Sequence, residues 1–95
     1  MSENVRVHVW VKGRVQAVGF RAFVQQSAVQ IGVTGWVRNV GYDTVEAVAE
    51  GTEAQIDRFL EMVKRGPSVS RVDESHEEWE AVTGEFAAFH VRYSR

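Results

Sequence analysis

The chain contains no cysteine and only one proline among its 95 residues. Without cysteine it can form no disulfide, thiolate zinc site, iron–sulfur cluster or thiol nucleophile. No apolar run approaches the roughly 18 residues that a membrane-spanning helix needs. The amino-terminal residues Met-Ser-Glu-Asn are polar and lack the apolar core of a signal peptide. These absences predict a cytoplasmic protein that does not act at membranes.

The composition that remains is that of an ordinary globular domain. Hydrophobic residues make up 44% of the chain and charged residues 25%, which argues against disorder. A chain of this length has room for one two-layer core, so we expect residues 1–95 to form a single domain, acting as a monomer. The net charge of −2 argues against nucleic acid as the main partner.

Charge is unevenly distributed along the chain. Residues 1–42 carry five basic residues against one acidic residue, for +4, whereas residues 43–95 carry six against twelve, for −6. The first part is therefore suited to binding a small anion, and the second to keeping the surface soluble. Ordinary scatter of surface charge is the alternative interpretation.

Hydrophobic periodicity predicts the order of the elements. Valines alternate with polar residues over 5–12, which is typical of a half-buried strand, and from Phe20 the apolar spacing becomes helical up to Gly32. The predicted elements are a strand at 5–12, a helix at 20–31, strands at 33–40 and 44–50 joined by a turn at 41–43, a second helix after Thr52, an extended but irregular segment at 69–79, and a short strand over Phe89, Val91 and Tyr93.

The second helix carries its own start and stop signals. Thr52 and Gln55 have the spacing of a capping box, and Gly66-Pro67 ends the helix. Its apolar stripe is interpreted as core rather than as a partner groove; it consists of Ile56, Phe59, Leu60 and Val63.

The resulting order is βαββαβ with an additional C-terminal strand. Because strand–helix–strand crossovers are right-handed, both helices should cover the same face of the sheet. We therefore predict an α+β fold of the ferredoxin-like type, with an antiparallel sheet, two helices on one face and a short strand at the end.

The segment GRVQAVGFR at 13–21 lies between the first strand and the first helix. Such a junction presents consecutive backbone N–H groups at the positive end of the helix dipole, where they can bind phosphate or carboxylate. No Lys-Ser/Thr pair follows, so this is not a Walker A loop. The candidate binding residues are Val15, Gln16, Ala17, Val18, Gly19 and Phe20.

Arg21 strengthens this interpretation. A cation in the first turn of a helix is unfavourable by about 0.3–1 kcal/mol, and an anion held between the loop and the guanidinium would reverse that cost. The planar guanidinium can also bind phosphate through two oxygens. The alternative is an ordinary solvated arginine.

Asn39 ends the strand sequence GWVRN at 35–39. Asparagine is depleted in strands, and its usual explanation here is turn formation before Gly41. Its carboxamide can also donate to and accept from a water molecule and so fix its position. That chemistry suits in-line attack on phosphorus, where positioning and charge stabilisation dominate.

These two segments resemble the signature motifs of the acylphosphatases. The resemblance continues through Thr44, Val45 and Gly51 and covers nearly the whole chain. It implies a ferredoxin-like enzyme that hydrolyses the carboxyl–phosphate bond of acyl phosphates to a carboxylate and inorganic phosphate. It also implies that Arg21 and Asn39 are the catalytic residues and that the backbone of residues 15–20 cradles the phosphate.

Two positions depart from the family pattern. Ala17 stands where a glycine is usual; if that position needs a positive φ, alanine costs about 1 kcal/mol or more. Asp43 also replaces a usual glycine, while Gly41 lies two residues earlier. Since aspartate tolerates left-handed geometry, we expect the turn to form in another way.

The predicted reaction uses no protein general base, because neither motif contains a histidine, carboxylate or cysteine. It is also predicted to use no metal or cofactor, since a carboxylate is a good leaving group. A substrate phosphate oxygen could take the proton of the attacking water. Two non-enzymatic alternatives remain. One is a ferredoxin-like domain that binds single-stranded RNA on His8, Trp10, Trp36 and Arg38, and the other binds small anions without turnover.

The remaining polar groups have simpler explanations. His8, His76 and His90 lack metal-ligand spacing and are interpreted as surface or strand residues. The acidic run over 73–80 is interpreted as a solvated edge strand, and Trp79 within it as a core or staple aromatic.

Overall fold

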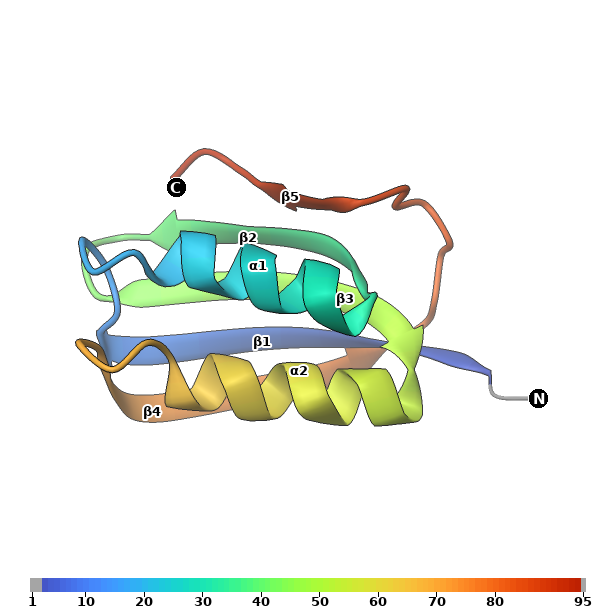
Figure 1. The fold of residues 1–95 in the computed structure, drawn as a ribbon, viewed down its shortest axis with the longest axis horizontal. Helices are drawn as coiled ribbons and strands as arrows, with labels where there is room; N and C mark the ends of the chain where they lie inside the picture. The colour runs from blue at the N-terminus through green and yellow to red at the C-terminus, as the bar shows by residue number, and fades with distance from the viewer. Residues whose placement is uncertain (1–2, 95) are drawn as a thin grey trace.

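The computed structural model describes residues 3–94. It contains the predicted elements in the predicted order (Figure 1). They are β1 (Asn4–Arg14), α1 (Phe20–Ile31), β2 (Thr34–Val40), β3 (Thr44–Thr52), α2 (Glu53–Arg65), β4 (Arg71–Glu80) and β5 (Phe89–Val91).

The strands form one sheet in the order β4-β1-β3-β2-β5. The first four pair antiparallel as predicted, but β5 pairs parallel to β2, so the sheet is mixed rather than wholly antiparallel. The reason is topological. Since β4 ends where β2 begins, residues 81–88 cross that end of the sheet and start β5 in the direction of β2 (Figure 1).

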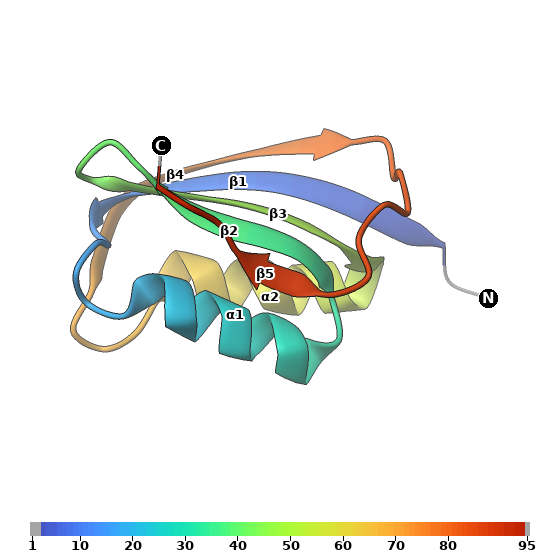
Figure 2. The same ribbon diagram turned by 90° about the horizontal axis from the view of Figure 1, so that it is seen from above.

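Both helices lie on one face of the sheet, as Figure 2 shows from above. Val7, Val9 and Val11 of β1 point toward them and are fully buried. Phe20, Val24 and Ala28 of α1 are buried, with Phe23 and Ile31 partly so, and all four residues of the predicted α2 stripe are buried as well. The apolar side chains of β1 and of the two helices therefore pack together in one core. None of the helices within residues 3–94 is long and apolar enough to cross a membrane.

The capping box of α2 is confirmed. Thr52 Oγ1 accepts from the Gln55 backbone N–H at 3.2 Å, and Gln55 Oε1 accepts from the Thr52 N–H at 2.9 Å. Gln55 also donates from Nε2 to the carbonyl of Ile31 at 3.2 Å. One side chain thus fixes the start of α2 against the end of α1, where Gly32 adopts a left-handed conformation as predicted.

The structure corrects three expectations near the end of the chain. The segment expected to be irregular forms a regular strand, β4, paired with β1 along its length apart from one register shift at Lys12/Gly13. It lies at the edge of the sheet, which confirms the edge strand predicted from the acidic run over 73–80. Trp79, expected in the core, is 54% exposed, because an edge strand has a neighbouring strand on one side only. The last strand ends at Val91, so Tyr93 lies beyond it and is exposed.

Candidate functional site

The loop before α1 and the turn between β2 and β3 lie at the same end of the sheet (Figure 1). Between them is a cavity of about 300 Å³. Its lining residues are Val15, Gln16, Ala17, Gly19, Phe20, Arg21, Ala22, Gln25, Asn39 and Val91. Both predicted catalytic residues and five of the six predicted loop residues therefore line one cavity. Val18 does not line it, because its side chain packs against the core.

The loop is held by its two ends and turns sharply between them. Val15 and Phe20 are buried in the core. Ala17 has a φ of 59° and Gly19 a φ of 75°, both in the left-handed region. The backbone strain expected for alanine at position 17 is therefore present. Such turns direct backbone N–H groups into a concavity, and Gly19 offers no side-chain cap to the first N–H groups of α1.

Gln16 connects this loop to the neighbouring turn. Its side-chain Nε2 lies 2.9 Å from the carbonyl oxygen of Thr44, 3.2 Å from that of Gly41 and 3.3 Å from that of Val40. The backbone N–H of Gly13 also donates to the carbonyl of Asp43 at 3.0 Å. The loop and the turn are thus fixed relative to each other at two points near the start of the loop.

The turn itself forms as expected despite the departure at position 43. Its left-handed residue is Gly41, with a φ of 60°, and Asp43 has no positive φ. The Asp43 carboxylate instead accepts from Thr44 Oγ1 at 3.0 Å and lies 3.7 Å from Lys12 Nζ. Gly41 therefore supplies the conformation, and Asp43 stabilises the start of β3.

Arg21 and Asn39 reach the cavity from different elements. Arg21 lies in the first turn of α1 and forms no ion pair or side-chain hydrogen bond with any residue in 3–94. Asn39 pairs with Val45, so its side chain lies on the helix-covered face of the sheet. Its Oδ1 is buried and has no hydrogen-bond partner in the described chain. Both side chains thus retain hydrogen-bonding capacity for a ligand.

The cavity is suited to an anion. Among the described residues that line it, Arg21 is the only charged one and none is acidic. A guanidinium beside backbone N–H groups at a helix N-terminus favours negative charge.

Three lining residues were not singled out from the sequence. Two of them, Ala22 and Gln25, lie in α1. Gln25 is four residues after Arg21 and so shares its helix face, and this spacing could have identified it. Val91 could not have been identified from the sequence, because it reaches the cavity only through the parallel pairing of β5 with β2. Gln25 Nε2 also donates to the carbonyl of Phe89 at 3.2 Å, which ties α1 to that strand.

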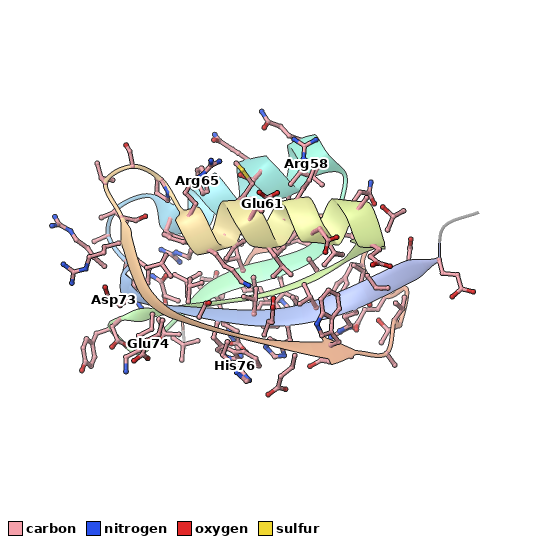
Figure 3. All side chains as sticks on the ribbon, turned by 90° about the horizontal axis from the view of Figure 1, so that it is seen from below. Arg58, Glu61, Arg65, Asp73, Glu74 and His76 are labelled. Atoms are coloured by element: carbon pink, nitrogen blue, oxygen red, sulfur yellow. The ribbon has the colours of Figure 1, made fainter. Side chains whose placement is uncertain are left out.

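The histidines lie elsewhere. His76 pairs with Glu78 at 2.9 Å on β4, and Figure 3 shows it pointing away from the helices. His8 lies on the same open face, 2.6 Å from Glu46 Oε2 and 2.9 Å from Glu80 Oε2. In residues 3–94 no group of three or more histidine and acidic side chains could hold a metal ion.

The residues considered for RNA binding do share this open face, but Trp36 is buried and His8 and Trp10 are partly buried. His8 stacks on Trp10 at 3.9 Å, and Trp36 is only 7% exposed. Arg38 lies over the Trp36 ring at 4.8 Å and donates from Nε to Glu46 at 2.6 Å. The face is thus a closed network of ion pairs and rings, with little aromatic surface on which a base could stack.

The carboxylates of this network are held in their charged form. Burial raises the pKa of Glu46, but hydrogen bonds from Arg38 and His8 outweigh it and bring the pKa below its ordinary value. Burial likewise raises the pKa of Glu50, and hydrogen bonds from the backbone of Thr83 and Gly84 and from Arg6 lower it by more. The network stabilises the sheet on the side opposite the helices and lies outside the cavity.

Known proteins are similar to this chain in sequence and in fold. A family model described as acylphosphatase matches residues 7–91. An acylphosphatase of Syntrophobacter fumaroxidans is 42% identical over 95% of this chain and 93% of its own, and one of Pyrobaculum islandicum is 46% identical over 94% and 95%. The crystal structure of acylphosphatase from Bacillus subtilis has a TM-score of 0.89 and 36% identity, covering 94% of this chain and 99% of that one.

The family match spans both the loop before α1 and the end of β2, the two segments that build the cavity. The relatives match along nearly their whole length as well as along nearly all of this chain. The sequence motifs, the fold and these similarities agree: the chain belongs to the acylphosphatase family.

Proposed function

We propose that Arg21, Asn39 and the backbone amides of residues 15–20 carry out the hydrolysis of acyl phosphates, the reaction of the acylphosphatase family. The observation that carries the proposal is the cavity, which combines one unpaired arginine, a turned loop and a free carboxamide, with no acidic lining residue. The substrate is a small-molecule acyl phosphate whose phosphoryl group enters between the loop and Arg21.

The loop amides and Arg21 bind the phosphoryl oxygens and stabilise the charge that spreads over them in the transition state. In phosphoryl transfer, positioning and preorganised positive groups supply most of the catalysis. Ala17 and Gly19 hold the loop in the turned form before substrate arrives, so these N–H groups need little reorganisation.

Asn39 orients the attacking water in line with the bond to be broken. The water oxygen forms a bond to phosphorus, the bond between phosphorus and the acyl oxygen breaks, and the carboxylate leaves with the electron pair. A phosphate oxygen takes the proton of the water, because no histidine or carboxylate among residues 3–94 lines the cavity. A carboxylate is a good leaving group, so the reaction needs no acid catalyst, and we propose that it needs no metal or cofactor.

The remaining parts of the proposal concern the whole molecule. Every proposed reacting group comes from one chain, which supports a single monomeric domain at 1–95. The covered rings of the open sheet face support an enzyme without a nucleic-acid partner. We propose that it acts in the cytoplasm.

The test is hydrolysis of benzoyl phosphate by the purified chain with and without EDTA. We expect turnover that EDTA leaves unchanged, near-complete loss in Arg21→Ala, and full activity in Arg65→Ala, which alters an exposed arginine of α2 (Figure 3). Binding of inorganic phosphate without any turnover would favour the non-enzymatic anion-binding alternative. Inhibition by EDTA would contradict the metal-free mechanism, and full activity of Arg21→Ala would contradict the assignment of that residue.

A further inference from the structure

Three residues that line the cavity of Arg21 and Asn39 have no part in the proposed mechanism. They are Ala22, Gln25 and Val91. The loop and Arg21 are proposed to take the phosphoryl group and Asn39 the water, so the acyl group occupies either the rest of the cavity or open solvent. The three side chains are uncharged, whereas the phosphoryl end of the cavity carries the positive charge of Arg21.

Val91 lies on the same face of the sheet as Asn39. It pairs with Val37 of β2 in parallel register, and residues paired across two strands share a face. Val37 is fully buried in the core beneath the helices. Asn39 follows it by two residues, the spacing that returns a side chain to the same face. The sheet therefore does not separate Val91 from Arg21 and Asn39, with which it lines one cavity.

The opposite wall of this part of the cavity belongs to α1, which lies beside β5 (Figure 2). Ala22 directly follows Arg21, and Gln25 is one helical turn after Arg21. In-line attack puts the leaving acyl oxygen on the side of phosphorus opposite the water. Because Asn39 is proposed to hold that water from β2, the acyl group extends along α1, past Ala22 and Gln25.

Gln25 holds the two walls together. Its side-chain Nε2 donates to the backbone carbonyl of Phe89, two residues before Val91, at 3.2 Å. β5 is an edge strand of three residues that pairs with β2 alone. A hydrogen bond from α1 therefore adds an attachment that the sheet does not provide. This side chain sets the width of the gap between Ala22 and Val91.

Apolar surface is exposed on both sides of the gap. Ala22 is exposed, and Val91 is 41% exposed although Phe89 in the same strand is buried. An apolar acyl group that covers these side chains removes their surface from water, which is favourable.

We propose that Ala22, Gln25 and Val91 form the acyl subsite and that it prefers a large apolar acyl group, such as an aromatic one, to a short one. Ala22 and Val91 contact the acyl group, and Gln25 is a positioning residue that keeps them at a fixed distance. This inference rests on the proposed function, because it assigns the acyl side of the same site.

The test compares benzoyl phosphate with acetyl phosphate, which differ in the apolar surface of the acyl group. The measured quantity is the ratio of kcat/KM for benzoyl phosphate to that for acetyl phosphate, taken relative to the wild-type ratio so that intrinsic reactivity cancels. Ala22→Leu fills the gap and should lower this ratio about tenfold, as for a group that no longer fits its pocket. Val91→Ala removes apolar surface and should lower it about threefold, mainly through KM for benzoyl phosphate.

Gln25→Ala tests the positioning role. Without the hydrogen bond to Phe89 the gap loses its fixed width, so the ratio should fall about as much as in Val91→Ala, again through KM for benzoyl phosphate. A merely structural role of Gln25 would lower kcat/KM for both substrates equally and leave the ratio unchanged.

Each variant has a matched control outside the cavity. Ala54→Leu places the same side chain in the first turn of α2, Val29→Ala shortens an exposed valine of α1, and Gln26→Ala an exposed glutamine of α1. All three should keep the wild-type ratio. If the wild-type protein hydrolyses neither substrate, the proposed function fails, and the acyl subsite fails with it. Hydrolysis of both substrates with a ratio that neither Ala22→Leu nor Val91→Ala changes refutes the acyl subsite alone.

Discussion

The side-chain amide of Gln16 donates a hydrogen bond to the backbone carbonyl of Thr44 over 2.9 Å. The same nitrogen is within 3.3 Å of the carbonyls of Val40 and Gly41. These carbonyls belong to the turn that directly follows Asn39. One side chain therefore fixes the loop that is proposed to bind phosphate relative to Asn39, the residue proposed to orient the water.

Gln16→Ala should lower both the stability of the protein and its activity. Losing these hydrogen bonds should lower the free energy of unfolding by about 1–2 kcal/mol. The loop would then no longer be held at a fixed distance from Asn39, so we expect kcat/KM for benzoyl phosphate to fall by about tenfold, since small displacements of catalytic groups are costly. Steady-state kinetics and urea unfolding measure the two effects. Gln30→Ala, on the exposed part of α1, is the control; an unchanged kcat/KM in Gln16→Ala would show that the bridge does not position the loop.

Asn39→Ala should lower turnover more than binding. The carboxamide is proposed to act on the water and not on the phosphoryl group, so kcat should fall by about a hundredfold, as for loss of one oriented polar group in an active site. KM and inhibition by inorganic phosphate should change little. Asn39→Asp has nearly the same shape but adds a negative charge, and it should weaken phosphate inhibition as well. A loss confined to KM in Asn39→Ala would instead place Asn39 among the phosphate-binding groups.

Ala17→Gly tests the strain in the loop. Alanine at a φ of 59° carries about 1 kcal/mol of strain that glycine would remove, offset in part by the greater freedom of glycine in the unfolded chain. We expect a small gain in the free energy of unfolding, at most about 1 kcal/mol, and tighter inhibition by inorganic phosphate. Gly19→Ala is the converse variant: a Cβ there meets nothing within 4 Å, so its destabilisation reports the backbone conformation alone. A loss of stability in Ala17→Gly would show that the strain of the left-handed alanine is smaller than the entropic cost of glycine in the unfolded chain.

Local sequence patterns were sufficient to predict most of the fold. The alternating valines of β1, the capping box at Thr52 and the left-handed Gly32 each depend on residues close together in the chain. The loop and the end of β2 could also be predicted as parts of one site, because both segments resemble the signature motifs of one family. The cavity confirms that Arg21 and Asn39 lie together; their roles in the reaction remain predictions.

The features that could not be predicted depend on distant parts of the chain. Trp79 was expected to be a core or staple aromatic, but it is 54% exposed on β4, which the strand order confirms as the edge strand that the acidic run indicated. Val91 lines the cavity because β5 runs parallel to β2, and that direction follows from the crossing at residues 81–88. The Gln16 bridge likewise joins residues whose proximity no local pattern indicates.

The ion-pair network on the open face of the sheet should make stability depend on pH. Four carboxyls in it have pKa values below their ordinary value of 4.5, because hydrogen bonds and cations stabilise their charged forms; they are Glu46, Glu50, Glu80 and Glu85. The folded protein therefore binds fewer protons than the unfolded chain near that pH. The stability that these groups confer is complete above pH 4.5 and is lost as the pH falls through their folded pKa values.

Glu46→Gln isolates one member of this network. Glu46 is 6% exposed and accepts from both His8 and Arg38 at 2.6 Å, so removing its charge should cost about 1–3 kcal/mol at pH 7, the range for hydrogen bonds to charged groups. The free energy of unfolding should then fall less steeply below pH 4.5 than in the wild type, because one proton-linked group is gone. Urea unfolding between pH 3 and 7 measures both effects, with Glu61→Gln on the exposed side of α2 as the control (Figure 3). Parallel pH curves for Glu46→Gln and the wild type would mean that another carboxyl governs the loss of stability in acid.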